Sequence, residues 1–174
     1  MDVVYYAAMS VDGFIAKPDG NVGWLDKYVQ SGEDYGYSRF FQSVEAMLMG
    51  RGTYEKTLSF GDWCYGEKPC WVMSSTLTET NIASVKLVND EPQNVIDRIA
   101  DFGYRKIWLV GGGQLGASLM RAGLLTTFEL AVIPEFLGQG IPLIQPGDYG
   151  ASLNLVDSKK FSNGVCLVKY RTTN

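Results

Sequence analysis

One local pattern occurs twice in this chain and restricts its fold: a short apolar run, then glycines, then the start of a helix. Residues 46–49 run into GRGT (50–53), and residues 106–110 run into GGGQ (111–114). Continuous apolar runs of this length are typical of strands buried on both faces, as in parallel sheets covered by helices. The pattern therefore predicts an α/β fold.

The remaining segments predict further strands and helices around these two units. We expect strands over residues 3–9, 70–73, 85–88 and 128–133, and helices over 31–44, 53–59, 90–102 and from 113 onward. Residues 153–157 and 165–171 predict two more strands joined by Asn163-Gly164, a strong tight-turn signal. The expected architecture is a central mixed sheet of about eight strands, flanked by about four helices, with an antiparallel C-terminal hairpin.

The predicted helix over 90–102 carries start and stop signals. Asp90 is expected as its N-cap, with Pro92 in the first turn and Gln93 completing a capping box. Phe102 is expected on its apolar face, and Gly103 is expected to end it.

Composition excludes several classes of function. The 174 residues contain no linker rich in Pro, Gly or Ser, so we expect one domain over 1–174. The net charge is −4 with no basic cluster, which argues against a nucleic-acid partner. Without histidine, His-dependent nucleophilic catalysis and His-ligated metals are excluded, and we expect no metal. Three cysteines without a CxxC pair and no long apolar run predict a cytoplasmic protein that does not enter the membrane.

The glycine segments are candidate phosphate sites, because glycine admits close approach of an anion to helix N–H groups. Arg51 and Thr53 add phosphate partners to the first segment, and Ser74 and Ser75 end a neighbouring predicted strand. A turn without a ligand remains the alternative for the 110–116 and 71–75 segments, and an N-cap Thr53 beside a solvent-facing Arg51 remains the alternative for 49–55. A Rossmann unit is rejected, because the glycines begin only at residue 111 and Glu129 lies on an apolar strand. Two separate glycine segments that each bind phosphate fit a dinucleotide lying along the edge of an α/β sheet that is not a Rossmann fold.

Asp34 is the candidate proton donor. It is expected in the first turn of the 31–44 helix, bordering the apolar stripe that includes Tyr37 and Phe41. A carboxyl at the edge of an apolar cavity has a raised pKa and can donate a proton near neutral pH. A first-turn Asp that interacts only with the helix dipole is the alternative. Trp24 follows a flexible loop and either closes over a planar ring or packs at the edge of the core, and Asp12 is expected to form a turn.

These elements resemble, in order and spacing, the dihydrofolate reductase-like superfamily, and within it the reductase domain of the bifunctional riboflavin-biosynthesis deaminase–reductase. The resemblance rests on YAAMSVDGFIA (6–16), GW (23–24), MGRGTYE (49–55), MSS (73–75), VGGG (110–113) and the stretch from IP (133–134) to GQGIPL (138–143). These segments span most of the chain.

The resemblance implies a sheet of eight strands with NADPH laid across its edge, serving a reductase of a pterin-, aminopyrimidine- or ribosylamino-pyrimidine-like molecule. Asp34 would be the catalytic carboxylate. The implied cofactor-binding residues are Ala8, Ile15, Gly50, Arg51, Gly52, Thr53, Ser74, Ser75, Val110, Gly111, Gly112, Gly113, Gln114 and Leu115. The expected substrate-binding residues are Tyr6, Trp24, Asp34, Tyr35 and Ser38. A homodimer is also implied.

Two departures from the folate reductases argue against dihydrofolate as the substrate. Ala131 stands where they place a threonine, and residues 76–85 contain no arginine for a glutamate tail. Dihydrofolate reduction and a non-catalytic NADP-binding module remain the alternatives to the reductase. A dimeric scaffold is compatible with either, with the apolar 128–137 region pairing with a second copy.

Overall fold

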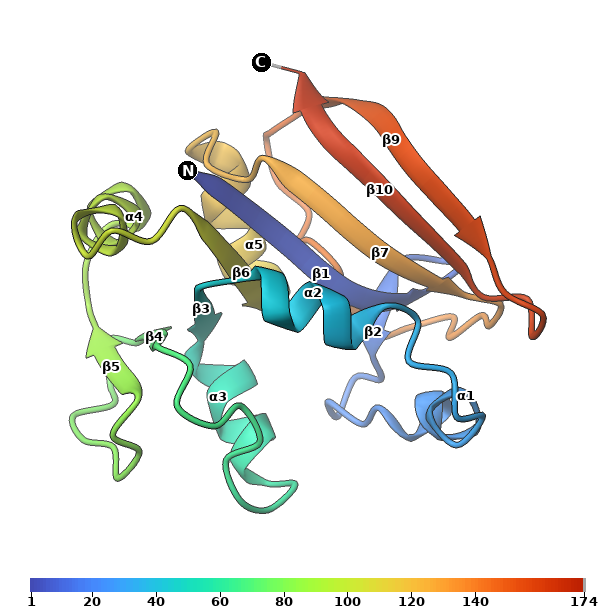
Figure 1. Ribbon diagram of the computed structural model, residues 1–174, viewed down its shortest axis with the longest axis horizontal. Helices are drawn as coiled ribbons and strands as arrows, with labels where there is room; N and C mark the ends of the chain where they lie inside the picture. The colour runs from blue at the N-terminus through green and yellow to red at the C-terminus, as the bar shows by residue number, and fades with distance from the viewer. Residues whose placement is uncertain (174) are drawn as a thin grey trace.

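The computed structural model describes residues 1–173, and strands and helices alternate along them (Figure 1). The strands are β1 (Asp2–Ser10), β2 (Phe14–Ala16), β3 (Ala46–Gly50), β4 (Cys70–Met73), β5 (Val85–Val88), β6 (Lys106–Gly111), β7 (Thr127–Ile133), β8 (Ile141–Pro142), β9 (Ser152–Lys160) and β10 (Cys166–Thr173). The helices are α1 (Asp26–Val29), α2 (Tyr37–Ser43), α3 (Arg51–Leu58), α4 (Pro92–Asp101) and α5 (Gly113–Arg121), with a 3₁₀ turn over Gly23–Leu25. Over residues 1–173, no helix has the length and apolar character needed to span a membrane.

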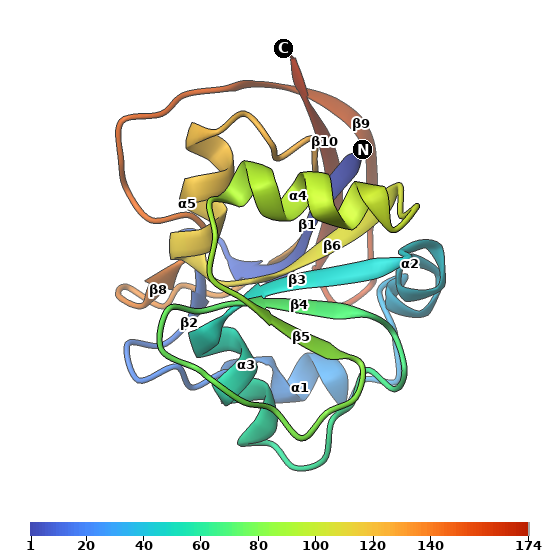
Figure 2. The same cartoon turned by 90° about the vertical axis from the view of Figure 1, so that its left-hand side faces the viewer.

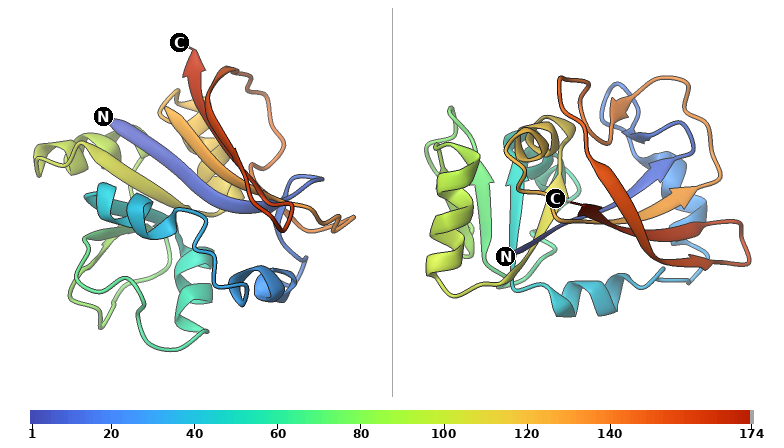
Figure 3. Two further views of the ribbon diagram at one scale, coloured as in Figure 1. Left: turned by 45° about the vertical axis from the view of Figure 1, so that its right-hand side comes forward. Right: turned by 90° about the horizontal axis from the view of Figure 1, so that it is seen from above.

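The central sheet has eight strands in the order β5-β4-β3-β6-β1-β7-β10-β9. The strands from β5 to β7 in this order are parallel to one another. At one end of the sheet, β10 is antiparallel to β7, and β9 is antiparallel to β10. The right-hand view of Figure 3 shows the C-terminal hairpin, in orange and red, at the opposite end of the sheet from the green strands. The predicted mixed sheet and its antiparallel C-terminal strands are confirmed. A separate two-stranded ribbon pairs β2 with β8.

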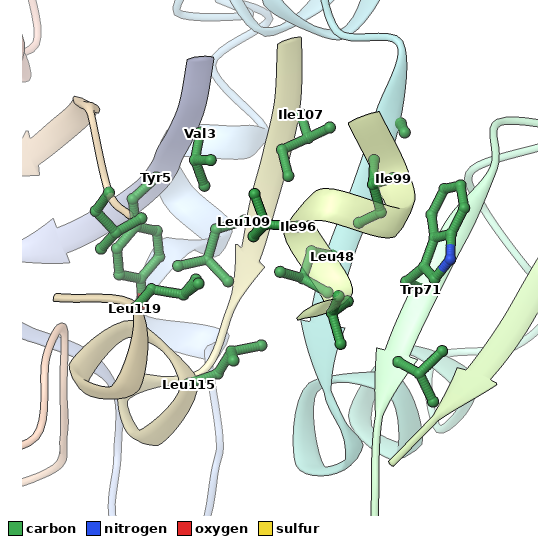
Figure 4. Close-up of a cluster of buried hydrophobic side chains, with 14 of the residues drawn as sticks. Val3, Tyr5, Leu48, Trp71, Ile96, Ile99, Ile107, Leu109, Leu115 and Leu119 are labelled. Carbon is green, nitrogen blue, oxygen red and sulfur yellow. The ribbon is translucent and has the colours of Figure 1, made fainter. Parts of the chain in front are cut away.

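Helices cover both faces of the parallel region. Figure 2 shows α4 and α5 on one side of the sheet and α1 and α3 on the other. The first face carries a core cluster that includes Val3, Leu48 and Leu109 from the strands with Ile99 and Leu119 from the helices (Figure 4). All five side chains are almost fully buried, so this cluster supplies much of the hydrophobic stabilisation.

The opposite face is rich in aromatic rings, and these rings hold α2 against the sheet. Tyr6 of β1 stacks on Phe40 of α2, with ring centroids 4.1 Å apart and an interplanar angle of 15°. The ring of Trp108 meets Phe40 edge-on at 5.5 Å, and its indole N–H donates to the Tyr6 carbonyl over 3.0 Å. Aromatic pairs of this kind add about 0.5–1.5 kcal/mol each beyond buried area. These aromatic contacts therefore fix α2 against the sheet.

The predicted helix over 31–44 is wrong in its first half. The helix begins only at Tyr37, because Gly36 has a φ of 83° and Tyr35 a φ of 51°, in the left-handed region that a right-handed helix cannot use. Gly32 also has a positive φ, of 77°. Asp34 therefore lies in an irregular segment that precedes α2, and not in the first turn of a helix.

The predicted capping box of α4 is also wrong. Glu91 occupies the N-cap position, and no side chain caps the helix. The Asp90 carboxylate instead accepts hydrogen bonds from Asn94 Nδ2 and Arg98 Nη2, each at 2.8 Å. Gln93 bonds with Asp97 one turn further on. The helix does stop before Gly103 as expected, but Phe102 lies beyond its last residue and is exposed.

The C-terminal strands are longer than predicted, and residues 161–165 connect them in place of a two-residue turn. The strand β9 extends to Lys160 and β10 begins at Cys166, because these two residues still pair with each other. The connection is closed by a hydrogen bond from the Phe161 N–H to the Val165 carbonyl, so Asn163-Gly164 is the centre of a longer turn. Likewise α3 begins at Arg51, two residues before its predicted start.

The predicted dimer surface at 128–137 does not have a free strand edge. The strand β7 pairs with β1 on one side and β10 on the other. Phe128, Leu130 and Ile133 are buried within the protomer. The strand β7 therefore offers no edge to a second copy, and dimerisation through the 128–137 region stays a prediction.

Candidate functional site

Three strand ends meet at one edge of the sheet. The strands β4, β3 and β6 are neighbours and parallel, with Gly50 opposite Met73 and Met49 opposite Gly111. The carboxyl ends of parallel strands are the usual ligand-binding edge of an open α/β sheet. The structure thus brings together the three corners that the sequence singled out.

The two glycine segments are in direct contact. A Cβ atom added at Gly111 would lie 3.2 Å from the Thr53 hydroxyl oxygen, and one added at Gly112 would lie 3.4 Å from it. A Cβ added at Gly50 would lie 3.9 Å from the Leu115 Cβ. Gly111 also has a φ of 155°, which favours glycine. The threonine hydroxyl of one corner therefore faces the glycines of the other.

Two helices begin at this edge without a side-chain cap. Gly50 is the N-cap of α3 and Gly112 is the N-cap of α5, and neither helix has an acidic residue in its first turn. The first N–H groups of a helix have no partner within it, and its dipole is positive at that end. Two adjacent, uncapped N-termini favour a bound anion with more than one phosphate.

The space at these N-termini fits such a group. An added Cβ at Gly52 would meet nothing within 4 Å, so the backbone of α3 is open to close approach. Gly113 differs, because an added Cβ would lie 2.5 Å from the Pro142 carbonyl oxygen. Its role is to let the chain around β8 pack against α5. Leu115 is buried in the core, which leaves its backbone for any ligand contact.

A guanidinium and hydroxyls lie beside the corner at the end of β4. Arg51 Nη1 donates to the Thr76 hydroxyl over 2.7 Å. The Ser74 hydroxyl accepts the backbone N–H of Thr76, which makes it a turn former as well as a candidate ligand. Ser75 is exposed, and the Arg51 Nε lies 3.7 Å from the Glu55 carboxylate. Thr76 was not predicted, although a hydroxyl next to the Ser-Ser pair was a signal that could have found it.

The expected nicotinamide end lies at the C-terminal half of β1. Ala8 and Trp24 are partly buried against one apolar cluster, which contains Tyr28 and Ala131. Ile15 is partly exposed on β2. The indole N–H of Trp24 is buried and has no hydrogen-bond partner within residues 1–173. Such a buried donor is costly when left unpaired, so this indole is well suited to meet a ligand acceptor.

Asp34 has a different environment from the one expected. Its side chain is exposed, and its carboxylate accepts the N–H groups of Gly36 at 2.8 Å and Ser38 at 3.2 Å. These hydrogen bonds, led by the one from Gly36 and aided by the charge of Lys159, hold the pKa of Asp34 below its ordinary value. The predicted rise of its pKa by burial is therefore wrong, because the carboxylate caps the start of α2 in contact with water.

The other expected substrate contacts lie around this segment. The Tyr35 hydroxyl donates to the Tyr28 carbonyl at 3.1 Å and accepts from Asn163 Nδ2 at 2.5 Å, so it ties the segment to the tip of the C-terminal hairpin. Ser38 is exposed on α2. Tyr6 faces α2 from β1, and its sheet neighbour on β7 is Glu129. Val110 and Gln114 lie at the glycine corner, with Gln114 exposed.

A cross-strand ion pair beside Tyr6 was not predicted. Lys169 Nζ of β10 lies 2.6 Å from Glu129 Oε1 of β7, and both side chains are mostly buried. Each of the two charged residues lies within an apolar stretch of sequence, and such a charge in a predicted strand was a signal of a buried charged partner. Their pairing depends on the strand register and is not visible in the sequence.

Comparisons with known proteins agree with this architecture. The family model of the RibD C-terminal domain matches residues 2–167. The uncharacterized protein YwjB of Bacillus subtilis is 34% identical over 165 residues, covering 94% of each chain.

Solved structures show the same likeness. A protein from Shewanella sp. PV-4 that carries a provisional riboflavin-biosynthesis name superposes with a TM-score of 0.91 and 27% identity, over 100% of both chains. The deaminase/5-amino-6-(5-phosphoribosylamino)uracil reductase of Thermotoga maritima has a TM-score of 0.73 and 13% identity over 99% of this chain and 56% of its own, a likeness of fold alone. The chain belongs to the RibD C-terminal domain family.

Proposed function

We propose that this protein is an NADPH-dependent reductase that transfers hydride to a C=N or C=O carbon of a small pterin-, aminopyrimidine- or ribosylamino-pyrimidine-like molecule. Membership of the RibD C-terminal domain family supports a riboflavin-type reductase. The name of the Thermotoga maritima relative, which includes a phosphoribosylaminouracil reductase, supports the pyrimidine class.

The observation that carries the proposal is the meeting of two uncapped helix N-termini beside an arginine. The first turns of α3 and α5 would hold the pyrophosphate, with the Thr53 hydroxyl between them. Arg51, Ser74 and Thr76 form a cationic, hydroxyl-rich corner suited to a further phosphate, such as the 2′-phosphate that distinguishes NADPH from NADH. The bound nicotinamide supplies the hydride, and the protein supplies orientation.

Asp34 enters this proposal as an ionised group. With its pKa lowered, the carboxylate carries no proton near neutral pH. It would orient a polar edge of the substrate or a water molecule, and the water would deliver the proton. The same observation favours the second candidate, a non-catalytic NADP-binding module, because the strongest carboxyl candidate lacks the raised pKa of a general acid.

One experiment separates the two candidates. NADPH oxidation is followed at 340 nm with a panel of pterins and aminopyrimidines, and cofactor binding is measured by calorimetry on the same preparation. Turnover with any member of the panel supports the reductase. Binding of NADPH without turnover across the panel supports the module, and absence of binding overturns both.

We further propose that the protein works in the cytoplasm as a homodimer. Cys64, Cys70 and Cys166 are all free thiols, as expected in a reducing compartment. Light scattering at micromolar concentration tests the dimer, and a monomeric mass contradicts it.

A further inference from the structure

The segment that follows β7, residues 135–145, joins the turn between β1 and β2 to the start of α5, and we call it the strap. At its beginning, the Glu135 carbonyl accepts the N–H of Val11 over 2.9 Å. Its middle contains β8, which pairs with β2. At its end, the Gln145 N–H donates to the Gly113 carbonyl over 3.1 Å. The strap therefore connects the β1–β2 turn with the glycine corner of α5.

The second half of the strap is fixed to the core and to α5. A Cβ atom added at Gly113 would lie 2.5 Å from the Pro142 carbonyl oxygen, so the two backbones are in direct contact. The hydroxyl of Tyr5, a fully buried residue of β1, donates to the Leu143 carbonyl over 2.9 Å. This half is held without any charged group.

The first half of the strap lacks such anchors. Residues 134–140 form no helix or strand. The Phe136 side chain is 76% exposed, so it does not fix the segment by burial. Gly138 is exposed and has a φ of 73°. The backbone N–H groups of this half need a partner outside the strap to hold it in one place.

Asp12 is that partner. Its Oδ2 accepts the Gly138 N–H at 2.7 Å, and its Oδ1 accepts the Leu137 N–H at 3.1 Å. Oδ1 also accepts the hydroxyl of Ser10, a fully buried residue, at 2.6 Å. These hydrogen bonds, led by the one from Ser10, hold the pKa of Asp12 below its ordinary value. The sequence predicted a turn former, and the structure shows a carboxylate that also binds a segment 125 residues away.

The turn that carries Asp12 borders the position proposed for the nicotinamide. Ala8 precedes the turn on β1, and Ile15 follows it on β2. The strap lies directly against β2, because a Cβ atom added at Gly140 would overlap the Ala16 carbonyl. A displacement of the first half of the strap therefore displaces β2 and the side of the proposed nicotinamide site that Ile15 forms.

We propose that Asp12 is a positioning residue for the cofactor, which fixes the first half of the strap against the β1–β2 turn and thereby sets the nicotinamide end of the site. This inference rests on the proposed function. The pyrophosphate end is held separately, through the contacts of the second half with Tyr5 and Gly113. Loss of the Asp12 carboxylate should therefore weaken ligands that carry a nicotinamide and spare ligands that end at the diphosphate and its ribose.

A carboxylate that only stabilises a turn is the competing explanation, because Asp residues bind nearby backbone N–H groups in many turns. The two explanations differ in what a substitution changes. A purely structural Asp12 affects the melting temperature and treats both kinds of ligand alike. A positioning Asp12 changes the difference in affinity between them.

The test measures the binding of NADP⁺ and of 2′-phospho-ADP-ribose, which is NADP⁺ without the nicotinamide, by calorimetry on the full-length protein. D12N keeps the shape of the side chain but places an NH₂ group or an uncharged oxygen opposite the strap N–H groups. The control D19N makes the same change at a carboxylate that accepts the Asn21 N–H in the next loop, outside the strap. We expect D12N to bind NADP⁺ at least about fivefold more weakly, the lower limit of typical coupling between sites. Its affinity for 2′-phospho-ADP-ribose should stay within about twofold, and D19N should match the wild type for both ligands.

Hydrogen exchange on the wild type provides a second measurement that needs no variant. If a fixed strap favours nicotinamide binding, then nicotinamide binding must favour the fixed strap to the same extent. We therefore expect NADP⁺ to slow the exchange of the Leu137 and Gly138 amides, which donate to Asp12, and 2′-phospho-ADP-ribose to leave it unchanged.

The remaining outcomes contradict separate parts of the account. Equal losses for the two ligands in D12N, or unchanged NADP⁺ affinity, contradict the inference. Exchange at residues 137 and 138 that does not respond to NADP⁺ also contradicts it, and this result decides if D12N does not fold. Both results leave the proposed function in place. Failure of the wild type to bind NADP⁺ contradicts the proposed function itself.

Discussion

Arg51→Ala should weaken the binding of NADPH while leaving NADH binding almost unchanged. The guanidinium is held by one hydrogen bond to Thr76, at 2.7 Å, in the corner proposed for the 2′-phosphate. A hydrogen bond to a charged group contributes about 1.5–3 kcal/mol. The Arg51 side chain is 51% exposed, so water screens it and the lower end of that range applies. We therefore expect a loss of about 1.5 kcal/mol, which is roughly a tenfold rise in Kd.

The assay is isothermal titration calorimetry with both nucleotides at fixed ionic strength. Lys56→Ala is the matched control, because it removes one positive charge from the same helix while Lys56 lies over the Phe60 ring. Glu55→Gln gives a second comparison, because it removes the carboxylate 3.7 Å from Arg51 and should strengthen NADPH binding by a few-fold at most. Equal losses for NADPH and NADH in Arg51→Ala would refute the reasoning that Arg51 recognises the 2′-phosphate.

Four further predictions concern individual residues. Gly52→Ala should keep or slightly raise the melting temperature, because an added methyl meets open space within a helix, yet it should weaken NADPH binding measured by calorimetry. Gly113→Ala should lower the melting temperature strongly, because the methyl would meet the Pro142 carbonyl at 2.5 Å, and an unchanged value would contradict the packing described for β8. Asp34→Asn should leave NADPH affinity unchanged and reduce turnover about 100-fold if the carboxylate guides the proton, as steady-state kinetics would show, and unchanged turnover removes it from the mechanism. Burial raises the pKa of Asp2, but hydrogen bonds from Thr126 and Thr127 together with the charges of Lys106 and Arg171 outweigh it and leave that pKa below 3.8. The contribution of Asp2 to stability is therefore present above pH 3.8 and is lost as the pH falls through the lower, folded-state value. The difference in urea midpoint between wild type and Asp2→Asn should therefore shrink on acidification below pH 3.8, and a constant difference would contradict the assignment.

The parallel part of the fold was predictable, because each of its strands is a short apolar run bounded by turn residues. The corners at Gly50 and Gly111 were predictable for the same reason, since a strand end, glycines and a helix start are local features. That these corners touch follows from the strand order, in which β3 and β6 are neighbours.

The region around Asp34 was not predictable from periodicity. Tyr37, Phe40 and Phe41 have helical spacing, but the extension back to residue 31 crosses Gly36, whose left-handed backbone ends the helix. Sequence spacing does not report the φ of a glycine. The error placed Asp34 beside an apolar stripe when it lies in water and caps the helix from outside.

Features that depend on pairing across strands were also missed. Glu129 and Lys169 are 40 residues apart, and each one alone looks like a stray charge in an apolar strand. The place of β7 in the sheet was missed for the same reason, because its apolar character reflects a central position between β1 and β10. Sheet order decides both, and no local signal encodes it.

The central claim is that the two glycine corners together hold one doubly phosphorylated nucleotide, and backbone amide NMR during a titration with NADPH tests it most directly. We predict that the amide signals of residues 50–53 and 111–114 shift together and saturate at a single Kd. Shifts confined to one corner, shifts elsewhere on the molecule, or no shifts at millimolar NADPH would contradict the account.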